Sequence, residues 1–322
     1  MKPTMIFIII LLSLITLYLI LDFIVAYFAT KLMVEPYCAP LDESLEKELT
    51  RRNITHEEFN HFFQFEHFTI NSKYGYHIQA SYIPKQKDVK FADGKERVVI
   101  FVHGWTCHRF SMLSYAKIYL QLGFHVFIYD HRYHYESDKK IITMGDKEAD
   151  DLQSVLQEII RRLGNHIVIG THGESMGSAT AMIHAGRYHS VDFVVEDCGY
   201  SSLKELMIYQ CKELRHLPLF PTIFFANLVF KMKTGSFYKD IQPAKLLSTC
   251  DDIPMFFIHG AKDRFVPSYM VYQNYDAKNG FKRIKIYPDC KHASCQIQHP
   301  KEYEKDVQEF LKQASIIDEM KL

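Results

Sequence analysis

The longest feature of the hydrophobic pattern is an apolar run from Met5 to Ala29, which is broken only by Ser13, Thr16 and Asp22. An α-helix rises about 1.5 Å per residue, so ~20 apolar residues are enough to cross the hydrocarbon core of a bilayer. A cleaved signal peptide is the alternative, but its apolar region is normally only about 7–15 residues long. We therefore interpret residues 1–30 as an uncleaved, single-pass transmembrane anchor.

Beyond the anchor, the pattern changes to short alternating segments. Residues 31–64 are rich in charged helix formers and predict a polar helical connector. In residues 65–315, short apolar runs alternate with amphipathic stretches, which predicts a mainly parallel sheet covered by helices on both faces. Residues 316–322 are expected to form a tail. We expect strands at 68–71, 77–83, 97–102, 125–129, 167–169, 193–196, 254–258 and 284–287, and helices at 111–122, 147–163, 268–276 and 301–313.

Residues 202–249 break this strand–helix alternation and contain the apolar sequence LPLFPTIFFANLVF. We predict that this insert forms a helical lid over the strand ends. Its apolar side chains are too many for an exposed surface, so we expect them to be covered. Phe224 and Phe225 are predicted to line a pocket for an acyl or alcohol group. The alternative is that these apolar residues only pack against the body of the domain.

Composition and charge exclude several classes of function. The chain has 38 basic and 38 acidic residues, so no global field favours nucleic acid. Its seven cysteines are an odd number without a paired spacing, which argues against a disulfide framework or a zinc site. The glycine-rich turns match no nucleotide-binding motif. The sequence HRYH at 131–134 has two histidines but no third ligand at a suitable spacing, so we expect a surface loop there. We expect neither a metal nor an organic cofactor.

The sequence GESMG at 173–177 follows a short apolar run and precedes a helical pattern rich in small residues. A strand, a sharp turn and a helix around G-x-S-x-G are the setting of a nucleophilic serine. Such a turn forces Ser175 into a strained backbone conformation, and the flanking glycines avoid collisions where strand and helix come close. The middle residue Glu174 is expected to be solvated or locally bonded. Ser175 is our candidate nucleophile.

A serine hydroxyl is a weak nucleophile, so it needs a histidine base that is held by a carboxylate. In a fold with this serine turn, the acid follows a later strand and the histidine comes last in the chain. Asp263 lies just after the expected strand at 254–258, and His292 lies just after the last strand. Asp197 is the rival acid, because it follows the preceding strand at 193–196. We predict a triad of Ser175, His292 and Asp263.

With these segments in place, the chain resembles the serine hydrolases of the α/β-hydrolase superfamily. The resemblance rests on VHGW at 102–105, GESMG at 173–177, HGAKDRFVP at 259–267 and KHA at 291–293, and it covers residues 65–315. Within the superfamily, the chain is similar to bacterial membrane-anchored hydrolases related to dienelactone hydrolases and prolyl-oligopeptidase-type domains. The resemblance implies an oxyanion hole formed by the backbone N–H groups of Trp105 and Met176.

These predictions together describe a membrane-anchored carboxylesterase that acts on a small-molecule ester through an acyl-enzyme. A thioesterase, an acyltransferase or a peptidase could use the same triad, and a binding module on the same fold is the non-enzymatic alternative. The short basic segment before the anchor favours a catalytic domain on the extracytoplasmic side. The seven cysteines without a paired spacing favour the opposite side, because exported domains tend to pair or avoid thiols. Of the two, we predict the extracytoplasmic orientation.

Overall fold

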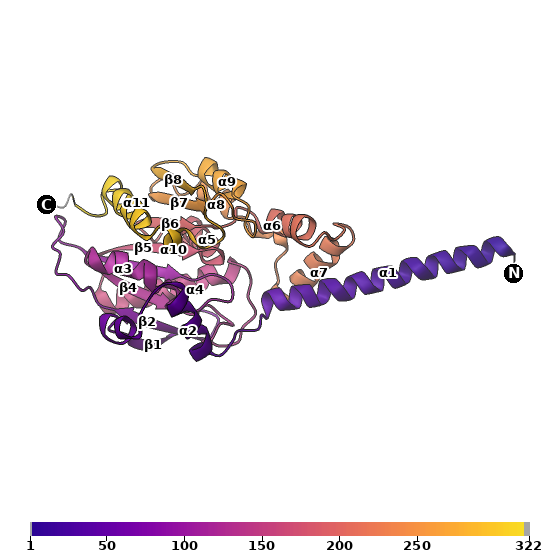
Figure 1. The fold of residues 1–322 in the computed structure, drawn as a ribbon, viewed down its shortest axis with the longest axis horizontal. Coiled ribbons are helices and arrows are strands. Elements are labelled where there is room, and N and C mark those ends of the chain that lie inside the picture. Colours follow the sequence, from indigo (N-terminus) through magenta and orange to yellow (C-terminus); the bar gives the residue numbers. More distant parts are fainter. Residues whose placement is uncertain (1, 319–322) are drawn as a thin grey trace.

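The computed structural model describes residues 2–318, and its centre is one twisted eight-stranded sheet (Figure 1). The strand order is β1-β2-β4-β3-β5-β6-β7-β8. β1 and β2 are antiparallel to each other and β2 is antiparallel to β4, whereas all the remaining pairs are parallel. The strands are β1 (Glu66–Asn71), β2 (His77–Ile83), β3 (Glu96–Val102), β4 (Phe124–Tyr129), β5 (Ile167–Glu174), β6 (Phe193–Asp197), β7 (Met255–Gly260) and β8 (Lys282–Tyr287).

Helices cover both faces of this sheet, and one long helix projects away from it (Figure 1). Within residues 2–318 there are also four single-turn elements: η1 (Glu58–Phe62), η2 (Arg109–Met112), η3 (Gln210–Leu214) and η4 (Tyr238–Asp240). The helices are α1 (Pro3–Val34), α2 (Leu41–Arg51), α3 (Leu113–Gln121), α4 (Asp146–Leu163), α5 (Met176–Tyr188), α6 (Leu203–Tyr209), α7 (Thr222–Thr234), α8 (Pro243–Leu247), α9 (Tyr269–Ala277), α10 (Cys295–Gln298) and α11 (Pro300–Gln313).

The sheet is buried on both faces, which explains the continuous apolar runs of its central strands. On β3, Val99 and Phe101 pack into a core shared with α3 and α11. Val98 and Ile100, which point the other way, pack into a second core shared with α4 and α5. Two-sided burial is typical of a parallel sheet built from strand–helix–strand units. The predicted fold class, an α/β-hydrolase sheet flanked by helices, is confirmed.

The first helix, α1, is long and apolar enough to cross a membrane, and its most apolar stretch is not buried by the rest of the chain. It continues to Val34, beyond the predicted end of the apolar run at Ala29. Asp22, the one acidic residue of the run, is buried and accepts a hydrogen bond of 2.6 Å from the Thr222 hydroxyl of α7. Asp22, the polar residue that interrupts the apolar run, therefore has a polar partner in the insert at residues 202–249.

The segments on either side of the predicted domain at residues 65–315 pack closely against it. In the predicted connector, Leu49 of α2 and Phe63 are buried in the core that contains α3 and α11. At the other end, Ile316 and Ile317 of the predicted tail are buried in the same core. Residues 319–322 lie outside the described part of the chain. Apolar contacts thus extend the packed body beyond both predicted boundaries.

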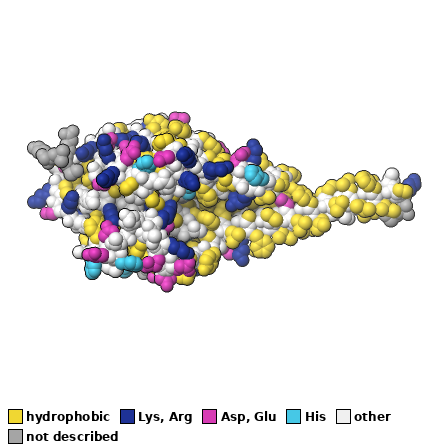
Figure 2. All heavy atoms as spheres, viewed as in Figure 1, with side chains coloured by type: hydrophobic (Ala, Val, Ile, Leu, Met, Phe, Trp, Pro, Cys, Tyr) yellow, Lys and Arg dark blue, Asp and Glu magenta, His cyan; other side chains and the backbone are white. Residues whose placement is uncertain are grey.

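The insert after β6 is helical, as the sequence predicts, and consists of α6, η3, α7, η4 and α8. Its buried residues join the C-terminal part of α1 and the start of α5 in a third apolar core. However, Phe220 and Phe224 remain 76% and 57% exposed beside α1. Leu217, Leu219 and Leu228 of the insert are also exposed, so the expectation that its apolar side chains would be covered is wrong for these residues. Figure 2 shows hydrophobic side chains covering the projecting helix and continuing over its base.

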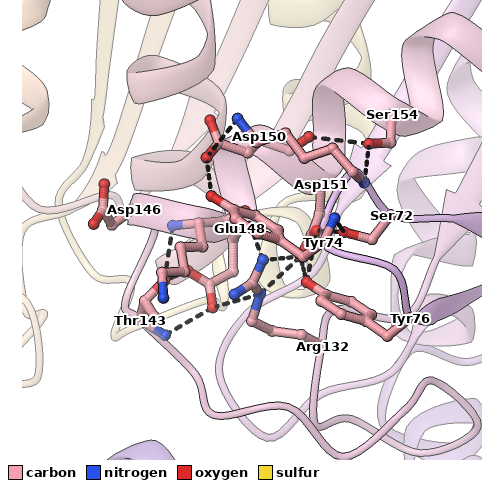
Figure 3. A network of polar contacts seen from close by, with 12 residues as sticks. Ser72, Tyr74, Tyr76, Arg132, Thr143, Asp146, Glu148, Asp150, Asp151 and Ser154 are labelled. Carbon is pink, nitrogen blue, oxygen red and sulfur yellow. Dashed lines mark hydrogen bonds and ion pairs between the residues drawn. The ribbon is translucent and has the colours of Figure 1, made fainter. Parts of the chain in front are cut away.

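The loop after β4 is buried, so the expectation of a surface loop for the HRYH sequence is wrong. His131 and His134 are fully buried, and burial lowers the pKa of both imidazoles. Arg132 lies between Glu148 and Asp151 of α4, with its Nε 2.7 Å from a carboxylate oxygen of Asp151 (Figure 3). This ion-pair network ties the loop to α4.

Candidate active site

The turn between β5 and α5 has the strained geometry that the sequence predicts. Ser175 has φ +58° and ψ −116°, a conformation that costs free energy for a residue with a side chain. A Cβ on Gly177 would collide with the carbonyl oxygen of Val102 at the end of β3. A Cβ on Gly173 would collide with the backbone of α5 at Ser178. Glycine is therefore required at both positions for the strand and the helix to approach this closely.

Two hydrogen bonds connect the three residues that the sequence predicts as a triad. The Ser175 Oγ lies 2.9 Å from the His292 Nε2, and the His292 Nδ1 lies 2.6 Å from the Asp263 Oδ2. Asp263 follows β7 and His292 follows β8, so the parallel strands bring both to the same edge of the sheet as Ser175. With the proton on Nδ1 shared with Asp263, Nε2 is free to accept the proton of the serine hydroxyl.

The environment of Asp263 keeps this carboxylate ionised. Burial alone would raise its pKa, but hydrogen bonds from His259 and His292 outweigh burial and lower the pKa to about 2. The second carboxylate oxygen accepts hydrogen bonds of 2.8 and 2.9 Å from the backbone N–H groups of Phe265 and Val266. An ionised and fully bonded carboxylate can hold the imidazole of His292 in one tautomer and stabilise its cation.

Asp197, the rival acid, lies beneath the serine turn rather than beside His292. Its carboxylate accepts hydrogen bonds from the hydroxyls of Tyr115 and Tyr303, at 3.2 and 3.0 Å. Burial, with a smaller contribution from the charge of Glu174, raises the pKa of Asp197 to about 6. Its backbone carbonyl accepts a hydrogen bond of 2.8 Å from the Ser175 N–H. The geometry gives Asp197 a supporting place under the turn.

Glu174 is neither solvated nor locally bonded, and that expectation is wrong. Its carboxylate is buried and lies 2.8 Å from Nη2 of Arg52, which follows α2 and is also buried. Burial would raise the pKa of Glu174, but the charge of Arg52 outweighs it and lowers the pKa. The sequence analysis missed Arg52, because no local motif indicates that a charged residue in the connector reaches the serine turn.

The loop after β3 lies against the serine turn, where the resemblance implies an oxyanion hole. A Cβ on Gly104 would lie 3.4 Å from the Glu174 carbonyl oxygen and 3.5 Å from the Ser175 Cβ. Trp105 therefore follows a point of close contact with Ser175, and Met176 opens α5. The first N–H groups of a helix have no partner within that helix. The two residues that the resemblance implies as oxyanion donors therefore lie in segments next to Ser175.

An apolar cavity of about 330 Å³ adjoins Ser175, Met176 and Trp105. The lid contributes Leu206, Met207, Ile223 and Ala226 to its wall. Phe224 and Phe225 are not among the lining residues, so the structure does not bear out the prediction that they line a pocket. Ile223 and Ala226 lie on the inner face of α7, and the helical periodicity turns the two phenylalanines away from the cavity.

Two groups of potential metal ligands occur among residues 2–318. The first consists of Cys198 with Asp263 and His292, so it overlaps the predicted triad. Burial raises the pKa of the Cys198 thiol well above its usual value, which disfavours the thiolate that binds a metal. The second group, Asp289, Cys290 and His299, lies in the loops that surround α10. In the first group, the hydrogen bonds of His292 to Asp263 and to Ser175 suit proton transfer to and from the serine.

The fold and the serine turn place this chain in a known class: it belongs to the α/β-hydrolase superfamily. The family described as alpha/beta hydrolase fold matches residues 97–208. A protein of Bacillus subtilis (strain 168), described as Uncharacterized protein YqkD, is 31% identical to this chain over 274 residues. The alignment covers 84% of this chain and 87% of the Bacillus subtilis protein.

Solved structures share the fold at lower sequence identity. The Pyrococcus furiosus esterase Pf2001 has a TM-score of 0.65 and 23% identity, over 80% of this chain and 93% of the esterase. The Pyrococcus horikoshii acylaminoacyl peptidase has a TM-score of 0.63 and 15% identity, over 84% of this chain and 45% of the peptidase. At these identities the similarity demonstrates a common fold.

Proposed function

We propose that this protein is a membrane-anchored serine hydrolase that cleaves a carboxylic ester. The observation that carries the proposal is the hydrogen-bonded series Ser175–His292–Asp263 beside an apolar cavity. In this series the serine hydroxyl has a histidine as its base, and the histidine has a carboxylate that holds its ring. The strained conformation of Ser175 adds support, because strain of this kind is concentrated at functional sites.

In this mechanism, the Ser175 Oγ attacks the carbonyl carbon of the ester while the His292 Nε2 takes the hydroxyl proton. The carbonyl oxygen becomes an oxyanion, which the N–H groups of Trp105 and Met176 stabilise. Collapse of the intermediate breaks the ester C–O bond, and His292 returns the proton to the departing alcohol. Water then attacks the acyl-enzyme with the same assistance and releases the acid. Asp263 stays ionised and stabilises the imidazolium in both steps.

The location of the enzyme is part of the proposal. α1 has the length and composition of a transmembrane segment. We place the catalytic domain on the extracytoplasmic side, because Lys2 forms a short basic segment before the apolar run.

Covalent labelling with a fluorophosphonate tests the proposal directly, because the reagent phosphonylates an activated serine. The wild-type chain should be labelled, and Ser175→Ala should abolish both labelling and ester hydrolysis. Ser294→Ala is the matched control: Ser294 lies two residues after His292, and its hydroxyl donates to the Lys291 carbonyl. A folded Ser175→Ala variant that is labelled at the wild-type rate would overturn the assignment. Parallel assays with thioesters and peptides distinguish an esterase from hydrolases that use the same triad on other acyl groups.

A further inference from the structure

The C-terminal part of α1 forms one wall of the cavity beside the serine. Ala29, Thr30, Leu32 and Met33 line the cavity from this side. The carbonyl of Met33 also accepts a hydrogen bond of 2.9 Å from the indole N–H of Trp105. The helix that can cross a membrane is therefore built into the candidate active site.

The lid helix α7 runs parallel to this part of α1 (Figure 1). Asp22 pairs with Thr222 near the start of α7, and Glu35 pairs with Lys233 near its end, with separations of 2.6 and 2.7 Å. Between them, the Thr30 hydroxyl donates to the carbonyl of Ala226. The start of α7 therefore lies level with Asp22, and its end lies level with Glu35.

The length of α1 places this junction near the surface of a bilayer. Met5 to Ile24 are 20 residues and rise about 30 Å, which matches the hydrocarbon thickness of a bilayer. This stretch contains one charged residue, Asp22, near its end. Asp22 and the start of α7 then lie at the boundary, where a buried carboxylate with a hydroxyl partner is tolerated.

The lid exposes apolar side chains at this same level. Phe220 and Phe224 are 76% and 57% exposed, and Leu217 and Leu219 beside them are also exposed. Large apolar side chains in contact with water are costly, whereas at a bilayer surface they are stabilised. Leu217 and Ile223 from this region also line the cavity, so its apolar wall continues from Ser175 to the exposed end of the lid.

We propose that the substrate is a lipid ester of the bilayer, whose acyl chain passes between α1 and the lid into the cavity at Ser175. The inference rests on the proposed function and specifies its substrate class. The exposed apolar segment of the lid, from Leu217 to Phe224, inserts into the membrane surface. The acyl chain of the lipid enters the cavity past this segment. The apolar lining binds the chain, and the ester carbonyl stops at Ser175, next to Trp105 and Met176.

The test uses the full-length protein in phosphatidylcholine vesicles, with p-nitrophenyl esters of increasing acyl length as substrates. Each methylene that the cavity buries should raise kcat/KM roughly fourfold until the cavity is filled. A cavity of about 330 Å³ is at the lower end of the size of ligand pockets, so one acyl chain should saturate it. A kcat/KM that is independent of acyl length, or that decreases for every ester longer than the butyrate, would overturn the proposal.

Two matched variants separate membrane delivery from general damage. Phe224→Asp places a charge at the level of Asp22, and the ratio of long-chain to butyrate turnover should fall at least tenfold. Met232→Asp is the control, because Met232 is 74% exposed on the same helix but lies near the Glu35 end, about 12 Å further along α7. Its ratio should stay within twofold of wild type. Equal ratios in the two variants would overturn delivery from the bilayer.

A third variant tests the wall that α1 provides. Thr30→Phe narrows the cavity from the α1 side and should shorten the acyl length of maximal kcat/KM. Fluorophosphonate labelling of Ser175 in each variant reports an intact site. Wild-type protein that is not labelled would refute the proposed function itself, whereas labelled protein with no preference for long chains would refute only the lipid substrate.

Discussion

The Arg52 guanidinium and the Glu174 carboxylate form a buried ion pair of 2.8 Å directly behind the candidate nucleophile. Arg52 follows α2 in the connector, and Glu174 is the last residue of β5. The Tyr115 hydroxyl donates a further hydrogen bond of 2.7 Å to the same carboxylate oxygen. The connector is therefore attached to the serine turn through charge as well as through apolar packing.

Removing one partner of this pair should destabilise the protein strongly. Arg52→Met leaves a buried carboxylate without its cation, which typically costs about 3–5 kcal/mol. The double variant Arg52→Met with Glu174→Gln should recover much of that loss, because no unpaired charge remains. Urea unfolding of the single and double variants measures both effects. A single variant within about 0.5 kcal/mol of wild type would show that the pair contributes little.

Asp263→Asn should reduce kcat far more than Asp197→Asn does. An asparagine at 263 favours the wrong tautomer of His292, a change that can cost about 10⁴ in turnover. Asp197 does not contact His292, so its amide variant should lose roughly tenfold or less. Steady-state kinetics with a soluble short-chain ester compares the two. Greater damage in the Asp197 variant would reverse the assignment of the acid.

The charge of Asp197 should make stability depend on pH. The pKa of Asp197 is raised to about 6 in the folded protein, so the folded state binds more protons than the unfolded chain between about pH 4 and 6. Ionisation of Asp197 therefore lowers the free energy of unfolding progressively as the pH rises through this window. Above the window the loss has its full value. The unfolding free energy of Asp197→Asn minus that of wild type should therefore increase by on the order of 1–3 kcal/mol when the pH is raised from about 4.5 to 8. Denaturant unfolding of both proteins at pH 4.5 and pH 8 provides the measurement. A difference in unfolding free energy that is the same at the two pH values would contradict the prediction.

Gly177→Ala should prevent formation of the serine turn. The added methyl group would collide with the backbone of Val102 and His103, which cannot move without disrupting β3. Gly235→Ala is the control: its backbone is left-handed, with φ +90° and ψ −5°, but no heavy atom lies within 4 Å of the added carbon, so only about 1–2 kcal/mol of backbone strain is expected. Fluorophosphonate labelling and thermal unfolding should distinguish the two. Normal labelling of Gly177→Ala would contradict the close approach.

The full-length protein should remain in the membrane fraction after washing with alkaline carbonate. An apolar helix that spans the bilayer resists this treatment, whereas a peripheral protein is released. Protease added to intact cells should digest the catalytic domain if it faces outwards. Release into the soluble fraction would contradict the anchor. Protection until the membrane is permeabilised would place the domain on the cytoplasmic side.

The sequence by itself determined the features that depend on local order along the chain. Short apolar runs alternating with helical patterns predicted the sheet, because a strand buried on both faces must be continuously apolar. The motif around Ser175 predicted the strained turn, because glycine at 173 and 177 marks a strand and a helix that approach each other closely; the collision at Gly173 is with the adjacent helix, whereas the one at Gly177 is with Val102 of β3. The order of Ser175, Asp263 and His292, each after a strand, placed them at one edge of a parallel sheet.

Only the tertiary structure decided which distant segments meet at that edge. Arg52 and Glu174 are 122 positions apart, and Thr30 and Ala226 are 196 apart, so no local pattern connects them. The lid sequence was apolar on several sides, and only its packing against α1 turned Ile223 towards the cavity and Phe224 away from it. The burial of the HRYH loop depended in the same way on Asp151 and Glu148 of α4. Long-range packing chooses among faces that the local sequence leaves equivalent, because burial free energy depends on the apolar area covered and not on position in the chain.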